Sequence, residues 1–244
     1  MKLTIAFVAC VVQLAACATV PPGPKDPRDK FESTNRSVYK FNRGLDRAVL
    51  RPVTVAYVKV TPKPVRKGVS NFLSNLAYPV TILNDYLQGK AKDGFSDIGR
   101  FTVNTVVGVG GIFDPATHWG LEKHDKDFGQ TLGKWGVPPG PFVMIPLLGP
   151  STVRDAPAKI VDRFVSPGSY VTDVPEAIAL AGGGVVNTRS DLLNTDRVID
   201  TAYDPYAFVR NAWLQRREFH VHDGQLPPEP EPAIDGTSTS ATGP

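Results

Sequence analysis

Cys17 is the residue whose chemistry the sequence predicts most directly, because its thiol follows Leu14-Ala15-Ala16, the pattern of a bacterial lipobox. A basic Met1-Lys2 start and the nearly all apolar residues 3–14 precede it. That layout is typical of a secretory signal, and the stretch is shorter than the roughly 20 residues that a membrane-spanning helix needs. We therefore predict a signal peptide over residues 1–16 and a diacylated Cys17 as the mature N-terminus. An ordinary signal peptide with a coincidental cysteine is the alternative.

The residues that follow Cys17 indicate the membrane to which the protein is sent and the boundaries of its segments. Ala18 is a small second residue, as in lipoproteins sent to the outer membrane, and each buried acyl methylene would contribute about 0.8 kcal/mol to anchoring. Residues 17–25 form a Pro-rich tether, and the acidic, Pro-rich residues 224–244 are predicted to be a disordered tail. No repeat or break in composition divides residues 26–223, so we predict one domain there.

Composition excludes several classes of protein. Both cysteines, Cys10 and Cys17, lie at the N-terminus, so the body has no disulfide framework, zinc ribbon or thiol nucleophile. Hydrophobic residues make up 41% of the 244 positions, which is typical of a globular protein. The net charge of +3 suits an anionic surface such as lipid headgroups, but it is too diffuse to indicate a nucleic-acid partner.

The remaining motifs do not add up to a catalytic or metal site. Residues 129–134 resemble a phosphate loop, but one residue is missing between the glycines and Trp135 replaces the metal-binding Ser or Thr. His118 and His124 lie near Asp125 and Asp127, yet their interval matches no standard metal motif. We interpret both as exposed loop histidines, and His220 and His222 as residues of a fraying helix end. The prediction is a protein without catalytic residues, bound metal or cofactor.

A basic stripe is the first candidate binding feature. In a helix predicted to start at Asp26-Pro27, apolar residues recur on one face at Phe31, Val38, Leu45 and Val49. The opposite face carries Arg36, Lys40, Arg43 and Arg47. Such a face is either simply solvated or meets lipid phosphates or a polar pore.

Three glycines, Gly108, Gly110 and Gly111, are the second candidate feature. They follow a helix marked by Phe95, Ile98, Phe101 and Thr105. Glycine accepts positive φ freely, so the cluster is either a simple helix cap and turn or a gate or hinge.

The elements that must position these residues are predicted to be mainly helical, so the fold class is all-α. We expect further helices after Pro64, from Pro79 to Gly89, from Ser151 to about Val165, over 176–202 with a break at 182–184, and from Asp204-Pro205 to about His220. Residues 53–60 alternate like a strand, but their helical surroundings favour a helix. Residues 138–150 are expected to form a short, rigid, Pro-rich apolar loop that either covers the core or dips into a membrane.

Taken in order, the motifs of the body resemble one family, the MlaA/VacJ lipoproteins of Gram-negative bacteria. The resemblance covers about residues 26–222, and many short patterns in register make it specific. They are Asn35-Arg36, Tyr39-Lys40-Phe41-Asn42, Arg51-Pro52-Val53, Ser70-Asn71-Phe72, Leu87-Gln88-Gly89, Arg100-Phe101, Asn104-Thr105, Gly108-Val109-Gly110-Gly111 with Asp114, Phe128-Gly129-Gln130-Thr131-Leu132-Gly133, Gly136-Val137, Gly140-Pro141, Arg154-Asp155 and Asp204-Pro205-Tyr206.

This resemblance implies a ring-shaped helical domain lying in the inner leaflet of the outer membrane, with a polar channel through it. It implies phospholipid as cargo, a trimeric porin as partner, and a soluble periplasmic carrier that passes the lipid on toward an inner-membrane transporter. It implies no enzymatic activity and no cofactor. Two alternatives remain: a structural envelope lipoprotein without transport, and a periplasmic lipid hydrolase, which would need a catalytic Ser or His.

Overall fold

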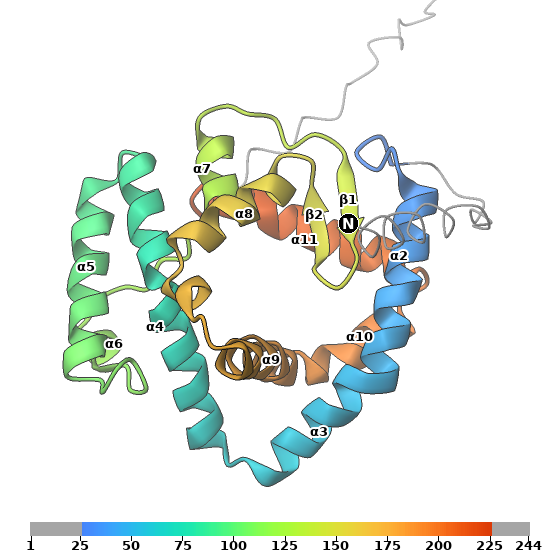
Figure 1. Ribbon diagram of the computed structural model, residues 1–244. Coiled ribbons are helices and arrows are strands. Elements are labelled where there is room, and N and C mark those ends of the chain that lie inside the picture. The colour runs from blue at the N-terminus through green and yellow to red at the C-terminus, as the bar shows by residue number, and fades with distance from the viewer. Residues whose placement is uncertain (1–25, 226–244) are drawn as a thin grey trace, which may run out of the picture.

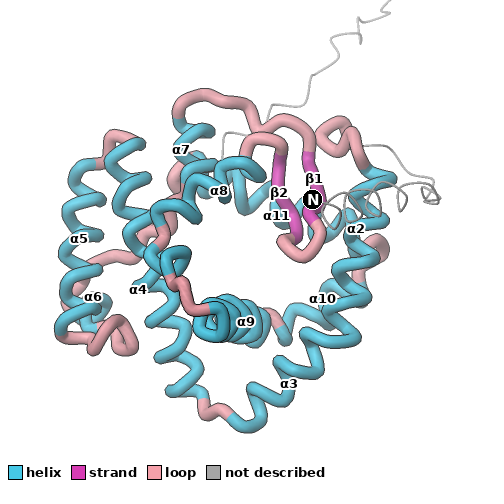
Figure 2. Tube along the Cα trace, viewed as in Figure 1, coloured by secondary structure: helices cyan, strands magenta, loops and turns pink. Residues whose placement is uncertain are grey.

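The computed structural model describes residues 26–225, so the predicted signal peptide, the predicted tether with Cys17 and residues 226–244 of the predicted tail lie outside the described residues. Helices dominate the described part, which confirms the all-α prediction (Figures 1 and 2). In chain order the elements are α2 (Glu32–Leu45), a π-helical turn η2 (Asp46–Leu50), α3 (Arg51–Val60), α4 (Lys63–Leu87), α5 (Ala91–Val106), α6 (Pro115–His118), α7 (Phe128–Lys134), β1 (Phe142–Ile145), β2 (Gly149–Thr152), α8 (Asp155–Val165), η3 (Pro167–Tyr170), α9 (Val174–Asp191), η4 (Leu193–Thr195), α10 (Asp196–Thr201) and α11 (Pro205–Val221).

The elements follow one another around a common centre in the view of Figure 1. From α2 the chain runs through α3 to α4, while α5 packs against the outer side of α4 and α6 packs against α5. Helix α9 is seen nearly end-on and contacts both α3 and α4. Among residues 26–225 there is no helix with the length and apolar character needed to cross a membrane.

Burial in this fold is inverted relative to an ordinary soluble domain. The fully buried side chains are mostly polar, including Thr54, Asn84 and Asp97, whereas large apolar side chains such as Val106 and Phe164 are exposed. The small apolar core lies where the two-stranded hairpin meets α2 and α11, and it consists of Phe142, Met144 and Tyr206 with Val38, Tyr39, Trp213 and Leu214 packed against them.

The first helix begins later than predicted. Asp26 was expected to cap it, but α2 starts at Glu32 because the acidic residues ahead of it are used elsewhere. The Asp26 carboxylate accepts from Arg28 and pairs with Arg210, and the buried Asp29 carboxylate accepts from Asn35, Tyr206 and Arg210. These contacts tie the N-terminal turn to α11 instead of extending the helix.

Pro79 does not open a new helix, so the predicted separate helix from Pro79 to Gly89 is wrong. Helix α4 runs unbroken through it from Lys63 to Leu87. A proline inside a helix removes one backbone hydrogen bond and costs about 3 kcal/mol. Burial of the flanking Tyr78, Val80 and Thr81 holds both halves of the helix in place and offsets that cost.

The apolar Pro-rich segment is not a plain loop, because it contains the hairpin of β1 and β2. The strands pair antiparallel, with Phe142 opposite Thr152 and Ile145 opposite Gly149. Two asparagines of α2, two turns apart, fix the hairpin. Asn35 Nδ2 donates to the Phe142 carbonyl (3.0 Å) and its Oδ1 accepts from the Met144 N–H (2.8 Å). Asn42 makes the same pair of contacts with the Ile145 carbonyl and the Leu147 N–H.

Two other predicted helix boundaries are wrong, and two predictions are confirmed. Ser151 lies in β2 rather than capping a helix, and α8 begins at Asp155. Helix α9 passes through the glycines at 182–184, since glycine tolerates helical dihedrals at about 1 kcal/mol each, and the break falls instead at Leu192. The structure confirms the helix over residues 53–60, and it confirms that Asp204 caps the last helix by accepting from the N–H groups of Tyr206 and Ala207.

Candidate functional site

The basic stripe, which runs from α2 into η2, is turned toward α10 and α11. Arg36 donates to Glu32 (2.8 Å) and to both oxygens of Asp204 (3.0 and 2.5 Å). Arg43 and Arg47 both bind Asp200, the latter at 2.8 Å. A cavity of about 310 Å³ lies among these residues. The stripe is therefore not a freely solvated face.

The stripe contains residues held in ion pairs, such as Arg36, and one exposed residue without an ion pair to residues 26–225, Lys40. Burial by itself lowers the pKa of Arg36, but the hydrogen bonds to Asp204 and Glu32 outweigh it and raise that pKa. In return the hydrogen bond from Arg36 lowers the pKa of Asp204. Lys40 is exposed and forms no ion pair with any residue in the range 26–225, so it is free to meet an anionic headgroup. Contact with lipid headgroups or a channel remains a prediction for all four residues.

The three glycines form the turn that ends α5. Gly110 and Gly111 have φ of 68° and 91°, and Val109 is also left-handed at 55°. Backbone hydrogen bonds close the turn, from Gly110 N to Thr105 O (2.8 Å) and from Phe113 N to Gly108 O (2.9 Å). A Cβ on Gly108 would overlap backbone carbonyls, and one on Gly111 would overlap the Asn75 side chain, whereas a Cβ on Gly110 would meet open space. A gate or hinge at this turn stays a prediction.

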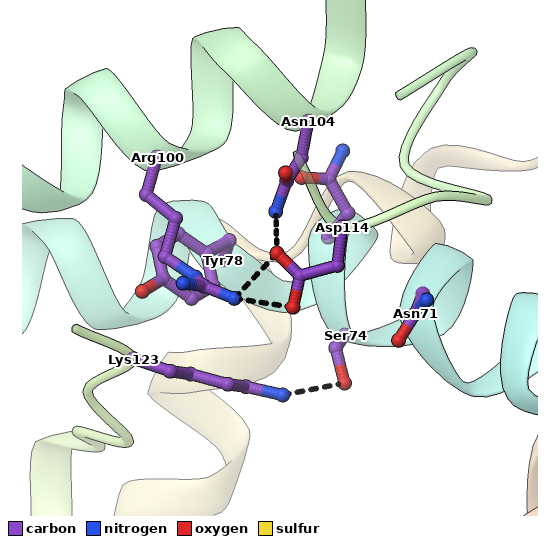
Figure 3. A pocket seen from close by; sticks show the side chains of 8 residues that line it. Asn71, Ser74, Tyr78, Arg100, Asn104, Asp114 and Lys123 are labelled. Atoms are coloured by element: carbon purple, nitrogen blue, oxygen red, sulfur yellow. Dashed lines mark hydrogen bonds and ion pairs between the residues drawn. The ribbon is translucent and has the colours of Figure 1, made fainter. Parts of the chain in front are cut away.

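A polar network beside this turn was not predicted as a site (Figure 3). Arg100, with 2% of its surface exposed, donates to the Asp114 carboxylate, to Thr117 and to the Leu121 carbonyl. Asn104 donates to Asp114 and accepts from the Ala116 N–H. The signal was present in the sequence, because Asp97, Arg100 and Asn104 recur at helical spacing on α5, opposite the exposed Phe95 and Ile98.

An apolar groove of about 1090 Å³ adjoins this network, between the first half of α4 and residues 107–118. Its wall is mostly aliphatic and aromatic, with Val65, Val69, Phe72 and Ile112 among the lining residues. Asn71 and Asp114 line both the groove and the small polar pocket of Figure 3, which also contains Lys123. The groove has the size and character to take acyl chains, with polar groups at one end.

One of the two predicted loop histidines, His124, lies in a different environment from the one predicted. His118 is exposed, as expected, but His124 is half-buried, and its Nδ1 lies 3.0 Å from Oδ1 of Asp97 in α5. The suspected partners Asp125 and Asp127 do not bind it. Asp127 instead caps α7 through the Gln130 N–H (2.8 Å) and pairs with Arg217. His124 and Asp127 therefore pair with residues of α5 and α11, which are distant in the sequence, and not with each other.

Comparison with known proteins agrees with this geometry. Residues 27–220 match the family model described as MlaA lipoprotein. The chain is 35% identical over 237 residues to the "Intermembrane phospholipid transport system lipoprotein MlaA" of Escherichia coli K12, an alignment that covers 95% of this chain and 94% of the relative. It is 33% identical over 231 residues to the protein of the same name from Haemophilus influenzae, covering 92% of each chain.

A solved structure is also similar. It is described as "Structural basis for maintenance of bacterial outer membrane lipid asymmetry", and it superposes with a TM-score of 0.72 at 36% sequence identity. The match covers 79% of this chain and 98% of the other. On the family model and these relatives together, the chain belongs to the MlaA lipoprotein family.

Proposed function

We propose that this protein is an envelope lipoprotein that carries phospholipid between membranes, and that it removes phospholipid misplaced in the outer leaflet of the outer membrane, which maintains lipid asymmetry. The names of its relatives, which are intermembrane phospholipid transport lipoproteins, support this function. The related structure, described in terms of outer-membrane lipid asymmetry, supports it as well.

The observation that carries the proposal is the inverted burial. Helix α5 turns Asp97, Arg100 and Asn104 inward and leaves Phe95 and Val106 exposed. In water such exposure would cost about 25 cal/mol per Å² of apolar surface, whereas in lipid it costs little. Helices whose apolar side chains point outward, while their polar side chains are buried, fit a domain that lies within one leaflet.

The finer parts of the proposal rest on the family resemblance. The domain would be anchored through Cys17 on the periplasmic side of the outer membrane and would form a ring around a polar channel. A trimeric porin would hold it in place, and a soluble periplasmic carrier would receive the lipid. The chain would act without chemistry on the lipid, as a conduit rather than an enzyme.

A groove-filling variant tests the transport function. In a strain that lacks the chromosomal copy, Val69→Trp should fill the groove, so phospholipid should accumulate in the outer leaflet and the cells should become sensitive to detergent with EDTA. Val198→Trp is the matched control, because Val198 is exposed on α10 and lines none of the grooves described here. Normal outer-leaflet composition with abundant Val69→Trp protein would contradict the groove's role.

A second readout separates the alternatives. A photo-crosslinking residue at Val69 should capture intact phospholipid in cells. Release of lysophospholipid by the purified protein would instead favour a hydrolase. A deletion strain with a weakened envelope but a normal outer-leaflet lipid composition would favour a purely structural lipoprotein.

A further inference from the structure

Two buried carboxylates and a histidine meet where three segments of the chain come together, and none of the three lines the apolar groove. Asp85 comes from the end of α4, Asp97 from α5, and His124 from the segment that precedes α7. One ligand atom from each lies within 4.8 Å of the other two. Both aspartates are completely buried, and the His124 side chain is 22% exposed.

Three of the four carboxylate oxygens of Asp85 and Asp97 have no hydrogen-bond donor among the described residues. Asp97 Oδ1 accepts from the Tyr78 hydroxyl (2.8 Å) and lies 3.0 Å from His124 Nδ1. Nothing within residues 26–225 donates to Asp97 Oδ2 or to either oxygen of Asp85. Buried polar groups in native proteins nearly always have partners, and an unpaired buried charge costs several kcal/mol. Three carboxylate oxygens at one buried point therefore call for a positive charge.

The lysines around the cluster do not supply that charge. Lys126 lies near enough to favour the ionised form of Asp85, but its Nζ is bound to Asp223 at 2.7 Å. Lys90 and Lys134 also bind Asp223. Burial, together with the adjacent Asp97, raises the pKa of Asp85. The charge must come either from a proton held within the cluster, on a carboxylate or on the His124 ring, or from a metal ion.

We propose that Asp85, Asp97 and His124 bind one divalent transition-metal ion of the zinc type. One imidazole nitrogen with two carboxylates is a ligand set suited to such ions, whereas Mg²⁺ and Ca²⁺ prefer oxygen ligands alone. The Tyr78 hydroxyl already holds Asp97 Oδ1, so Oδ2 is the oxygen left for the ion. The ion would join α4, α5 and the segment before α7, and its role would be to stabilise the fold.

Zinc titration of the full-length lipoprotein in detergent, after treatment with EDTA, tests the site. We expect one Zn²⁺ per chain by calorimetry and a rise in the unfolding midpoint of about 5–10 °C at a hundredfold excess over the dissociation constant. Mg²⁺ should produce no comparable rise. Asp85→Asn and His124→Gln should each abolish the zinc-dependent rise. Asp125→Asn should retain it, because Asp125 is an exposed neighbour outside the cluster.

Two further measurements keep the proposal falsifiable if those variants fail to fold. Co²⁺ bound to the wild-type protein should give the visible d–d absorption of a site with nitrogen and oxygen ligands, and Zn²⁺ should displace it. The zinc stoichiometry should persist in His118→Gln and His220→Gln, which alter histidines outside the cluster. Failure of the wild-type protein to bind zinc, or loss of binding in these two variants, would overturn the site. Absence of zinc binding together with a more stable Asp85→Asn would show a shared proton instead.

Discussion

Arg100 and Asp114 form a two-oxygen ion pair that joins α5 to the N-cap residue of α6. Arg100 Nη2 lies 2.7 and 2.6 Å from the two Asp114 oxygens, and only 3% of the Arg100 side chain is exposed. Asp114 also caps α6 through the Thr117 N–H (3.2 Å). Since the glycine turn lies between these two residues, their pairing fixes the turn at the edge of the apolar groove.

Removing Asp114 should therefore destabilise the domain strongly. In Asp114→Ala the buried Arg100 guanidinium loses its counter-ion, a change that typically costs about 3–5 kcal/mol. Chemical unfolding of the purified protein measures the loss. Glu122→Ala is the control, because Glu122 is exposed and its removal should change stability by less than about 0.5 kcal/mol. Equal effects of the two substitutions would mean that the pair contributes little.

The glycine turn allows a test of gating at one position only. Side chains at Gly108 or Gly111 would overlap neighbouring atoms, so tryptophan there should give degraded protein. Gly110 faces open space but has φ of 68°, so alanine and tryptophan should share the same backbone strain of about 1–2 kcal/mol. If the turn is a gate, Gly110→Trp should cause outer-leaflet phospholipid to accumulate while Gly110→Ala does not. Wild-type barrier function with Gly110→Trp would remove the turn from the transport path.

The basic stripe should divide into structural and binding residues. Arg36→Gln would leave Asp204 without its main partner and should cost about 1–3 kcal/mol of stability. Lys40→Gln should leave stability unchanged within about 0.5 kcal/mol, because Lys40 is exposed. If the stripe meets headgroups, Lys40→Gln should weaken binding to vesicles that contain anionic lipid, and the loss should disappear at high salt. Unchanged vesicle binding would assign the stripe a structural role alone.

Asp162 should make stability fall as the pH rises. Burial raises its pKa from 3.8 to about 6, so the folded state holds more protons than the unfolded state between those values. The stability contributed by the protonated form is present below pH 3.8 and is lost as the pH rises through 6. Asp162→Asn keeps an acceptor for the Phe128 N–H but does not titrate. The free energy of unfolding should be measured by denaturation at a series of pH values. Between pH 3.8 and 6 it should fall for the wild type relative to Asp162→Asn. The same pH dependence in both proteins would contradict the raised pKa of Asp162.

Local signals predicted the parts of the fold that local interactions determine. Asp204 caps α11 through its own neighbours, and the helical surroundings of residues 53–60 outweighed their strand-like alternation. The errors came where distant contacts decide the structure. Packing around Pro79 keeps α4 intact, and Asn35 and Asn42 fix a hairpin more than a hundred residues away in the chain.

In the candidate sites, too, local spacing predicted what lies on one helix, and contacts between distant parts of the chain were missed. The stripe of Arg36, Lys40, Arg43 and Arg47 does share one side of α2 and η2, as its spacing predicted. Its acidic partners, Asp200 in α10 and Asp204 at the start of α11, could not be read from that spacing. Asp85, Asp97 and His124 are separated by 12 and 27 residues. The packing of α4 against α5 brings the two aspartates together, and the segment before α7 adds His124. Their spacing matches no motif, so the sequence alone gave no reason to group them.

The lipid anchor is the prediction on which the cellular role depends, and Cys17 lies outside the described residues. If the thiol is acylated, Cys17→Ala should leave the signal peptide uncleaved or release the protein in a soluble form, and the outer-membrane fraction should lose it. Mass spectrometry of the wild-type N-terminal peptide should show the acyl groups on Cys17. Cys10→Ala is the matched control, since Cys10 lies within the signal sequence and would be removed with it. Normal membrane fractionation of Cys17→Ala, together with an unmodified wild-type peptide, would mean that the exposed apolar faces of the helices hold the domain in the membrane without an anchor.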